Sequence, residues 1–91
     1  MKNKDKLVSI ILNCYNGEKY LKDSLKSIIQ QTYHNWELIF WDNKSTDGSK
    51  KILKSFNHKK FKYFLAKKHT RLHAARNLAI RKAKGSFISF I

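Results

Sequence analysis

Short runs of apolar residues alternate with amphipathic segments along this chain, and that order restricts its fold more than any other feature. The apolar runs have the length and the branched residues of buried strands, and they lie at residues 7–12, 36–41, 61–65 and 86–91. Strands that alternate with helices form parallel βαβ units, with right-handed crossovers and helices on both faces of the sheet. The sequence therefore predicts an α/β fold, a three-layer α/β/α sandwich around a parallel sheet.

Three segments between these runs have apolar residues at helical spacing. We expect Asn16 to cap the first helix, and Ser45 or Thr46 to cap the second, with Asp47 in its first turn. The third helix is expected to end at Gly85. The inner faces would consist of Tyr20, Leu21, Leu25, Ile28 and Ile29 in the first helix, Ile52, Leu53 and Phe56 in the second, and Leu72, Ala75, Leu78, Ala79 and Ala83 in the third.

The length and composition indicate one small soluble domain. The chain has 91 residues, of which 42% are hydrophobic, a content typical of a folded chain rather than a disordered one. No apolar stretch approaches the roughly 18–20 residues that span a membrane, and the run Leu7–Leu12 is too short for an export signal. The single cysteine, Cys14, excludes an internal disulfide and fits a reducing cytoplasm. Residues 1–6 are expected to form a disordered basic tail.

The positive charge lies almost entirely in the second half of the chain. Residues 1–47 contain seven lysines and all six acids, a net charge of +1, whereas residues 48–91 contain thirteen lysines or arginines and no acid. Such an asymmetry indicates an anionic partner, which could be a phosphorylated substrate, nucleic acid or an anionic membrane surface. It is equally typical of a lysine-rich proteome, or of a fragment separated from an acidic half.

Three loops that follow strands should meet at the carboxyl edge of the sheet, where open α/β sheets bind their ligands. These are residues 13–17, residues 42–49 and the segment that leads into residues 72–77. Together they offer an aromatic ring at Tyr15, a carboxylate at Asp42 and a guanidinium at Arg76. An aromatic ring stacks on a base, a carboxylate accepts a hydrogen bond from a base or ribose, and arginine binds phosphate. The combination suits a nucleotide.

Two of these residues also have a structural interpretation. Tyr15 could be a loop residue packed on the surface, and Asp42 could close a turn by accepting hydrogen bonds from backbone amides.

His69 and His73 have the i, i+4 spacing of a helical metal pair, but no cysteine or acid lies near them in the sequence to complete a site. We expect both histidines to be exposed to solvent.

The order of several stretches resembles the start of the family 2 glycosyltransferases, over essentially residues 7–91. The stretches that carry the resemblance are Val8–Asn16, Tyr20-Leu21, Ser24–Ile28, Gln31-Thr32-Tyr33, Trp36–Ile39, Asp42–Ser49, Ala75-Arg76-Asn77 and Gly85–Ile91. The family implies a Rossmann-like GT-A fold. It also implies transfer of a sugar from a nucleotide-diphosphate donor, often a UDP-sugar, to a hydroxyl of a glycan or lipid-linked acceptor in polysaccharide or cell-surface glycan synthesis.

The resemblance also implies roles for particular residues. Tyr15 would lie against the nucleobase, with Asn13, Cys14 and Asn16 shaping its loop. Asp42 would contact the base or the ribose, and Arg76 would face the nucleotide or its diphosphate.

The chain departs from the family pattern in two places. Asn43 stands where the family usually has a second aspartate, which keeps a hydrogen-bonding group and removes a charge. The family's Asp-x-Asp, which holds a divalent metal such as Mg²⁺ or Mn²⁺, follows directly after the fourth strand, and this sequence ends at Ile91. The expectation is therefore the N-terminal, nucleotide-binding portion of a longer domain, without catalytic residues or metal ligands and without turnover by these 91 residues alone.

A second interpretation is a basic α/β module, not an enzyme, that binds nucleic acid or another polyanion. The charge of residues 48–91 favours it, and the lack of any known nucleic-acid motif disfavours it. The aromatic residues among these lysines are spaced as core residues of a helix and a strand. The lysines would then form a solvated face, which could rest on an anionic membrane at the inner side of the cell.

Overall fold

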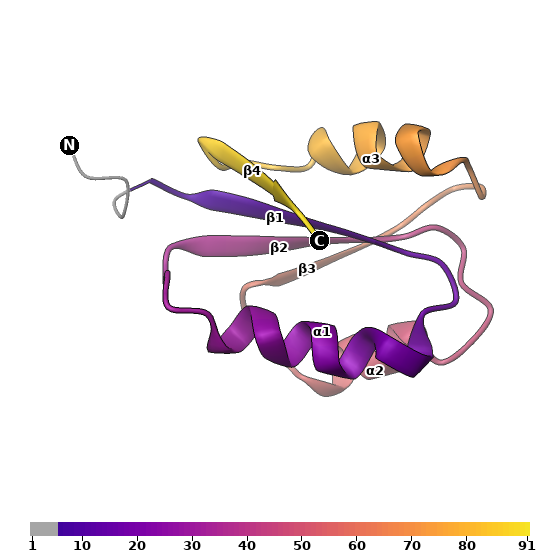
Figure 1. The fold of residues 1–91 in the computed structure, drawn as a ribbon. Coiled ribbons are helices and arrows are strands. Elements are labelled where there is room, and N and C mark those ends of the chain that lie inside the picture. Colours follow the sequence, from indigo (N-terminus) through magenta and orange to yellow (C-terminus); the bar gives the residue numbers. More distant parts are fainter. Residues whose placement is uncertain (1–5) are drawn as a thin grey trace.

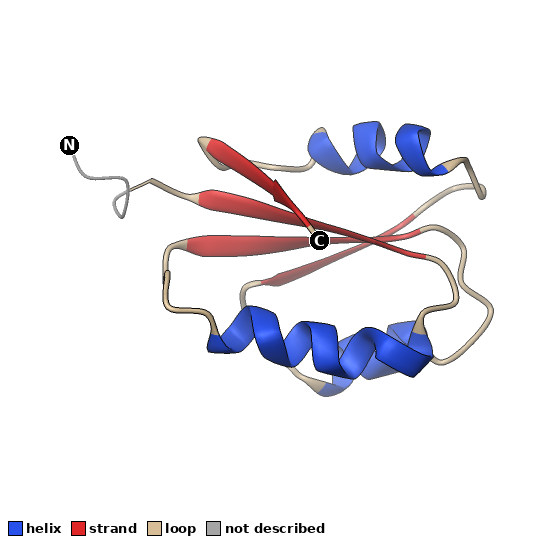
Figure 2. Cartoon of the chain, viewed as in Figure 1, coloured by secondary structure: helices blue, strands red, loops and turns tan. Residues whose placement is uncertain are grey.

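The computed structural model describes residues 6–91, so that residues 1–5 of the expected disordered tail lie outside the described residues. Strands and helices alternate without exception along the described residues, as the sequence predicts (Figure 1, Figure 2). The elements are β1 (Val8–Cys14), α1 (Glu18–Gln30), β2 (Trp36–Asp42), α2 (Ser49–Ser55), β3 (Phe61–Leu65), α3 (Leu72–Ile80) and β4 (Phe87–Phe90).

The strands form one sheet in the order β3-β2-β1-β4, and all three pairings are parallel. The chain steps in one direction from β1 to β3 and then returns to the other side of β1 to add β4. Right-handed crossovers that run in opposite directions place their helices on opposite faces of a sheet. Accordingly, α1 and α2 cover one face and α3 covers the other (Figure 1). The predicted three-layer α/β/α sandwich is therefore confirmed.

The core is divided by the sheet, because successive side chains of a strand point to opposite faces. All seven residues of the central strand β2 are buried, which explains its nearly unbroken apolar sequence. The cluster under α1 and α2 consists of Ile10, Leu12, Cys14, Leu21, Leu25, Ile28, Trp36, Leu38, Phe40 and Leu53. The cluster under α3 consists of Ile11, Ile39, Trp41, Ala66, Ala75 and Ala79.

The predicted helix caps were wrong at α1 and α2. The N-caps are Gly17 and Gly48, and Asp47 precedes α2 instead of lying in its first turn. Asn16 cannot take the extended conformation of an N-cap, because its φ is +53°, in the left-handed region. Its side chain instead links two loops by accepting hydrogen bonds from the backbone amides of residues 46 and 47.

The helix α3 is shorter than predicted. It ends at Ile80, whereas the sequence pattern continues to Ala83. The amides of Lys82 and Ala83 donate to carbonyls three residues earlier, so the chain tightens into turns there.

A buried polar cluster fixes the turn between α3 and β4. The Glu37 carboxylate, on β2, accepts hydrogen bonds from the Ser9 hydroxyl (2.6 Å) and from the Lys84 backbone amide (2.7 Å). The Gly85 amide donates to the Ser9 hydroxyl. A Cβ atom at Gly85 would lie 2.6 Å from the Leu7 carbonyl oxygen, so this close approach requires glycine. The cluster sets the register of β4 beside β1.

Candidate functional site

Three loops meet at the carboxyl ends of β1, β2 and β3, as the sequence predicts. The Asn16 Oδ1 atom accepts hydrogen bonds from the Thr46 amide (2.7 Å) and the Asp47 amide (3.3 Å), which joins the first loop to the second. The second loop is joined to the third through Asn43 and Thr70. The three loops therefore form one connected polar edge.

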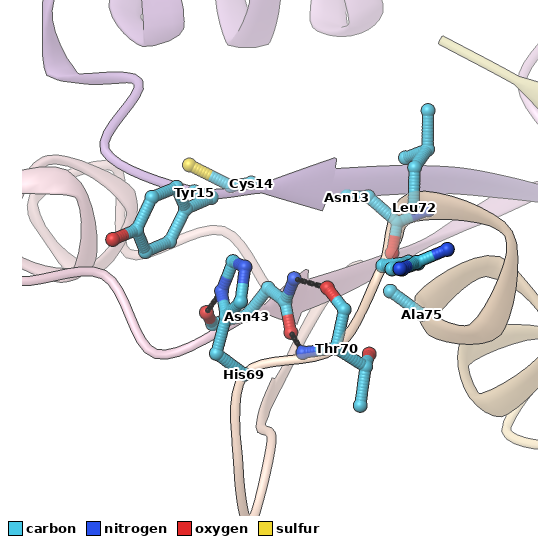
Figure 3. A pocket seen from close by; sticks show the side chains of 9 residues that line it. Asn13, Cys14, Tyr15, Asn43, His69, Thr70, Leu72 and Ala75 are labelled. Carbon is cyan, nitrogen blue, oxygen red and sulfur yellow. Dashed lines mark hydrogen bonds between the residues drawn. The ribbon is translucent and has the colours of Figure 1, made fainter.

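A pocket of about 210 Å³ opens at this edge, beside the start of α3 (Figure 3). Its walls come from β1 and the loop that follows it, from the end of β2, and from the segment that enters α3. The lining residues are Asn13, Cys14, Tyr15, Asn43, His69, Thr70, Arg71, Leu72 and Ala75. Three of the six residues expected at the site, Asn13, Tyr15 and Asn43, are thus brought together.

The open end of the pocket has an aromatic pair. The Tyr15 side chain is 51% exposed, and its ring centroid lies 4.4 Å from that of His69 at an interplanar angle of 59°. His69 Nδ1 lies 3.0 Å from the Asn43 carbonyl oxygen, which can only accept, so Nδ1 carries the proton in this contact. His69 is exposed, as the sequence predicts. The two tilted rings form an aromatic pair in the wall of the pocket.

Asn13 supplies a polar atom to the same pocket. Its Oδ1 atom is buried and has no hydrogen-bond partner among the described residues. A buried acceptor without a partner costs about 1–3 kcal/mol, so a movement of this side chain that gave its oxygen a donor would be favoured.

Asp42 is not among the residues that line this pocket. It is 2% exposed, and its two carboxylate oxygens accept hydrogen bonds from the Ser45 amide (2.8 Å) and the Tyr63 hydroxyl (2.6 Å). Tyr63 belongs to β3, in register with Phe40, so Asp42 points to the α1 and α2 side of the sheet. Burial, and next the hydrogen bond to Asp42, raise the pKa of the Tyr63 hydroxyl. Asp42 thus closes a turn by accepting a hydrogen bond from a backbone amide, which is the structural alternative given for it in the sequence analysis.

Asn16 and Arg76 also do not line the pocket. The Arg76 guanidinium lies over the ring of Phe90 on β4, 5.4 Å from the ring centroid. It therefore stands farther along α3, on the β4 side. Asn16 holds the loops together, as described above.

The helices that begin at this edge differ in which groups accept hydrogen bonds from their N-terminal amides. The Glu18 amide at the start of α1 donates to Asp47 Oδ2, and the Gly48 amide at the start of α2 donates to Glu18 Oε1. The Ser49 amide and hydroxyl donate to Asp47 Oδ1. The hydrogen bond from the Ser49 side chain is the main reason that the pKa of the Asp47 carboxyl is lowered. Asp47 thus accepts hydrogen bonds from the N-termini of both helices, and Glu18 of α1 accepts one from the N-terminus of α2.

The N-terminus of α3 has no such cap. Its N-cap residue is Arg71, whose side chain makes no capping hydrogen bond, and the first turn of α3 contains no acidic residue. Arg71, Leu72 and Ala75 line the pocket, so this helix end faces it. Free amides, the positive end of the helix dipole and an arginine together favour an anion.

Six of the nine lining residues were not predicted as site residues, and they are Cys14, His69, Thr70, Arg71, Leu72 and Ala75. The sequence pattern singles out His69 only through its i, i+4 spacing from His73. The sequence placed the segment between the third strand and the third helix at this edge, and His69, Thr70 and Arg71 lie within it. Every such junction of a parallel sheet opens at the same edge.

The described residues contain no group of three or more histidine, cysteine, aspartate or glutamate side chains placed to hold a metal ion. None of the helices in residues 6–91 is long and apolar enough to cross a membrane.

Comparison with protein families identifies one match over nearly the whole chain. The model of the family described as glycosyl transferase family 2 matches residues 9–91. A UDP-Glc:alpha-D-GlcNAc-diphosphoundecaprenol beta-1,3-glucosyltransferase, WfgD of Escherichia coli, is 37% identical over 96% of this chain and 34% of its own length. Glycosyltransferase GlyG of Streptococcus pneumoniae is 33% identical over 93% of this chain and 29% of its own length. The chain thus spans about a third of the length of these relatives.

Solved structures have the same fold. The structure of TarS from S. aureus in complex with UDP has a TM-score of 0.86 and 28% identity, over 92% of this chain and 26% of that chain. A mannosyltransferase from Pyrobaculum calidifontis, in complex with GDP-Man and Mn²⁺, has a TM-score of 0.83 over 91% of this chain and 26% of that chain, and its 24% identity bears on the fold alone. The family match, with relatives above 30% identity over nearly all of the chain, shows that it belongs to glycosyl transferase family 2.

Proposed function

We propose that this chain binds the nucleotide of a nucleotide-diphosphate sugar, with UDP-sugars as the preferred class, in a family 2 glycosyltransferase domain. The observation that carries the proposal is the pocket at the carboxyl edge of the sheet. It has the Tyr15 and His69 rings at its open end and the uncapped N-terminus of α3 in its wall. A base would lie against the rings, and the diphosphate would lie toward Arg71 and the amides of α3.

The size of the pocket limits what it holds. Ligand pockets usually measure about 300–1,000 Å³, and this one measures about 210 Å³. The pocket therefore suits the base and part of the ribose, while the diphosphate and sugar lie outside it, over the helix terminus. UDP is the first ligand to test, because TarS, which shares 28% identity with this chain, is known in complexes with UDP and with UDP-GlcNAc.

The expected roles of Asp42 and Arg76 remain predictions. Asp42 would act on the nucleotide only by holding the loop of Ser45, since Ser45 and Tyr63 already donate to its oxygens. Arg76 would have to leave the ring of Phe90 in order to reach a diphosphate.

A divalent metal does not fit the side chains in residues 6–91. Of the five acids in residues 6–91, Asp23 is exposed on α1 and the other four accept hydrogen bonds within the protein, and no group of three histidine, cysteine or acidic side chains is placed to hold a metal. The metal thus remains a prediction for ligands of a longer domain, and so do a base that activates the acceptor and a glycan or lipid-linked acceptor. We also predict that the 91 residues bind UDP without transferring sugar, which an assay with a radiolabelled UDP-sugar would test.

Isothermal titration of the chain with UDP tests the proposed function. Tyr15→Ala should weaken UDP binding by about tenfold, since stacking of a base on an aromatic ring contributes about 1–3 kcal/mol. Tyr20→Ala is the matched control, because Tyr20 is 53% exposed, lies on α1 and does not line the pocket. If both variants and the parent chain bind UDP with equal affinity, Tyr15 does not stack on the base. If the parent chain does not bind UDP, the proposed function is excluded.

The alternative of a nucleic-acid module rests on the thirteen cationic side chains and the absence of acids in residues 48–91. A short single-stranded DNA, titrated at two salt concentrations, distinguishes the two functions. A nucleic-acid module would bind the DNA with an affinity that falls steeply with salt, because each phosphate contact releases a counterion. A nucleotide site would bind UDP more tightly than DNA at the higher salt concentration.

A further inference from the structure

The side chain of Asn43 forms a two-point contact with one residue of the segment that enters α3. Its Nδ2 atom donates to the Thr70 carbonyl oxygen (2.7 Å), and its Oδ1 atom accepts from the Thr70 amide (3.0 Å), as the dashed lines in Figure 3 show. Asn43 is 6% exposed, so water competes little for these bonds. Its own backbone amide donates to the Cys14 carbonyl (2.8 Å), which fixes Asn43 to the end of β1.

Only a side chain that donates and accepts at once can make this contact. A carboxamide has an NH₂ group and a carbonyl oxygen, whereas an ionised carboxylate only accepts. An aspartate at this position could keep the bond from the Thr70 amide, but its second oxygen would face the Thr70 carbonyl oxygen. Two acceptors at this separation in a buried site repel each other, so the hydrogen bond to the Thr70 carbonyl oxygen would be lost.

The contact controls the wall of the nucleotide pocket. Thr70 is held by the side chain of Asn43, and the neighbouring His69 ring is held by the Asn43 backbone carbonyl (3.0 Å). His69 in turn lies against Tyr15, at 4.4 Å between ring centroids. The residue that follows Thr70 is Arg71, the N-cap of α3. One residue thus contacts both parts of this segment, Thr70 through its side chain and His69 through its backbone carbonyl.

We propose that Asn43 is a positioning residue, which shapes the nucleotide site by holding the segment of residues 69–71 through paired hydrogen bonds to Thr70. This inference rests on the proposed donor-nucleotide site, and it assigns a task to the position at which this chain departs from its family. Asn43 acts on the nucleotide through the segment that it holds.

Asn43→Asp provides the test, because the introduced carboxyl group can imitate the amide only when it is protonated. At about pH 8 we expect UDP to bind about tenfold more weakly than to the parent chain, the equivalent of about 1.4 kcal/mol. Burial and the facing Thr70 carbonyl oxygen should raise the pKa of the introduced carboxyl above its ordinary value of about 3.9. As the pH is lowered toward about 5, this carboxyl should then take up a proton and donate to the Thr70 carbonyl, so the ratio of the two dissociation constants should shrink. The ratio is the useful quantity, because the titration of free UDP is the same in both experiments and cancels.

Two further variants separate this effect from others. Asn57→Asp introduces the same charge at an exposed residue with a positive φ, outside the nucleotide pocket, and should leave the ratio near one at every pH. Asn43→Ala removes both bonds, so its loss of affinity should not recover at low pH. Circular dichroism checks that each variant is folded before it is titrated.

A second readout does not depend on UDP. In the ligand-free chain, the Thr70 amide signal in a nitrogen–proton NMR spectrum should move in Asn43→Asp at high pH and return toward its original position as the pH falls. An unchanged Thr70 signal would overturn the inference, as would a pH-independent ratio of UDP affinities. A shifted Thr70 signal in a chain that does not bind UDP at all would support the positioning of residues 69–71 and would exclude the donor-nucleotide function.

Discussion

The two faces of the sheet are built in different ways. On one face, α1 and α2 bury large aliphatic and aromatic residues, and their N-termini are neutralised by Glu18 and Asp47. On the other face, α3 meets the sheet through Ala75 and Ala79, and its N-terminus begins at Arg71 without a capping side chain. On the first face, acidic side chains of the chain itself accept hydrogen bonds from the helix N-termini. On the second face, the N-terminus of α3 has no capping side chain and lies beside a pocket.

This difference separates stability from binding within a small domain. Large buried side chains and paired caps contribute free energy of folding, and they leave no group free for a ligand. Small residues let a helix lie close to the sheet, and an uncapped helix end keeps its amides available for an anion. Substitutions on the two faces should therefore have different consequences.

The largest effect is expected from Phe40→Ala, on the α1 and α2 face. Phe40 is fully buried, and truncating a buried phenylalanine costs about 3–5 kcal/mol. Urea denaturation followed by circular dichroism measures this loss. Ala79→Gly, at a buried position of α3, should cost only about 1 kcal/mol, mostly through helix propensity. Equal losses would contradict the contrast between the two faces.

A smaller effect, with opposite signs for stability and binding, is expected from Arg71→Asp. Arg71 has φ −67° and ψ 158°, the extended conformation of an N-cap, so an aspartate there can accept a hydrogen bond from the first turn of α3. The free energy of unfolding should rise by about 1 kcal/mol, and UDP should bind about tenfold more weakly. Arg81→Asp makes the same charge change at the other end of α3. If it weakened UDP binding as much, overall charge rather than the helix terminus would be responsible.

The smallest effect concerns the pH dependence contributed by Asp47. The folded state lowers the pKa of this carboxyl, so the charged form stabilises the fold. That contribution is complete above the unfolded-state pKa of about 3.9, and it is lost as the pH falls through the lower folded-state pKa. Asp47→Asn should therefore have a lower urea midpoint than the parent chain at neutral pH, and the two midpoints should converge in acid. A constant difference at all pH values would show that Asp47 acts through its shape alone.

The layers and the parallel sheet could be predicted from the sequence, because apolar periodicity and element order decide them. The meeting of three loops at one edge followed from the same topology. What the sequence could not show is the side of the sheet to which a residue at a strand end points. Asp42 and Asn43 are consecutive, yet Asp42 accepts a hydrogen bond from Tyr63 on one face and Asn43 binds Thr70 on the other. An error of one residue in the alternation of side chains at a strand end is enough to assign each of these two residues to the wrong face of the sheet.

The helix caps were missed for a related reason. Sequence patterns assign a capping side chain to its own helix, whereas here Asp47 accepts from the first amide of α1 and Glu18 accepts from the amide of Gly48 at α2. Partners some thirty residues apart have no local signature. The same holds for His69, whose neighbours at the site are Tyr15 and Asn43.

The cluster of Glu37, Ser9 and Gly85 has a consequence for how the protein assembles during synthesis. The Gly85 amide and the Ser9 hydroxyl that it contacts are 76 residues apart in the chain. While the ribosome still holds Gly85, β1 can pair with β2 but not with β4, and closing so long a loop carries an entropic cost that local contacts do not. The face covered by α1 and α2 can therefore form on the nascent chain, whereas the β4 side of β1 is completed only after nearly all of these residues have been made.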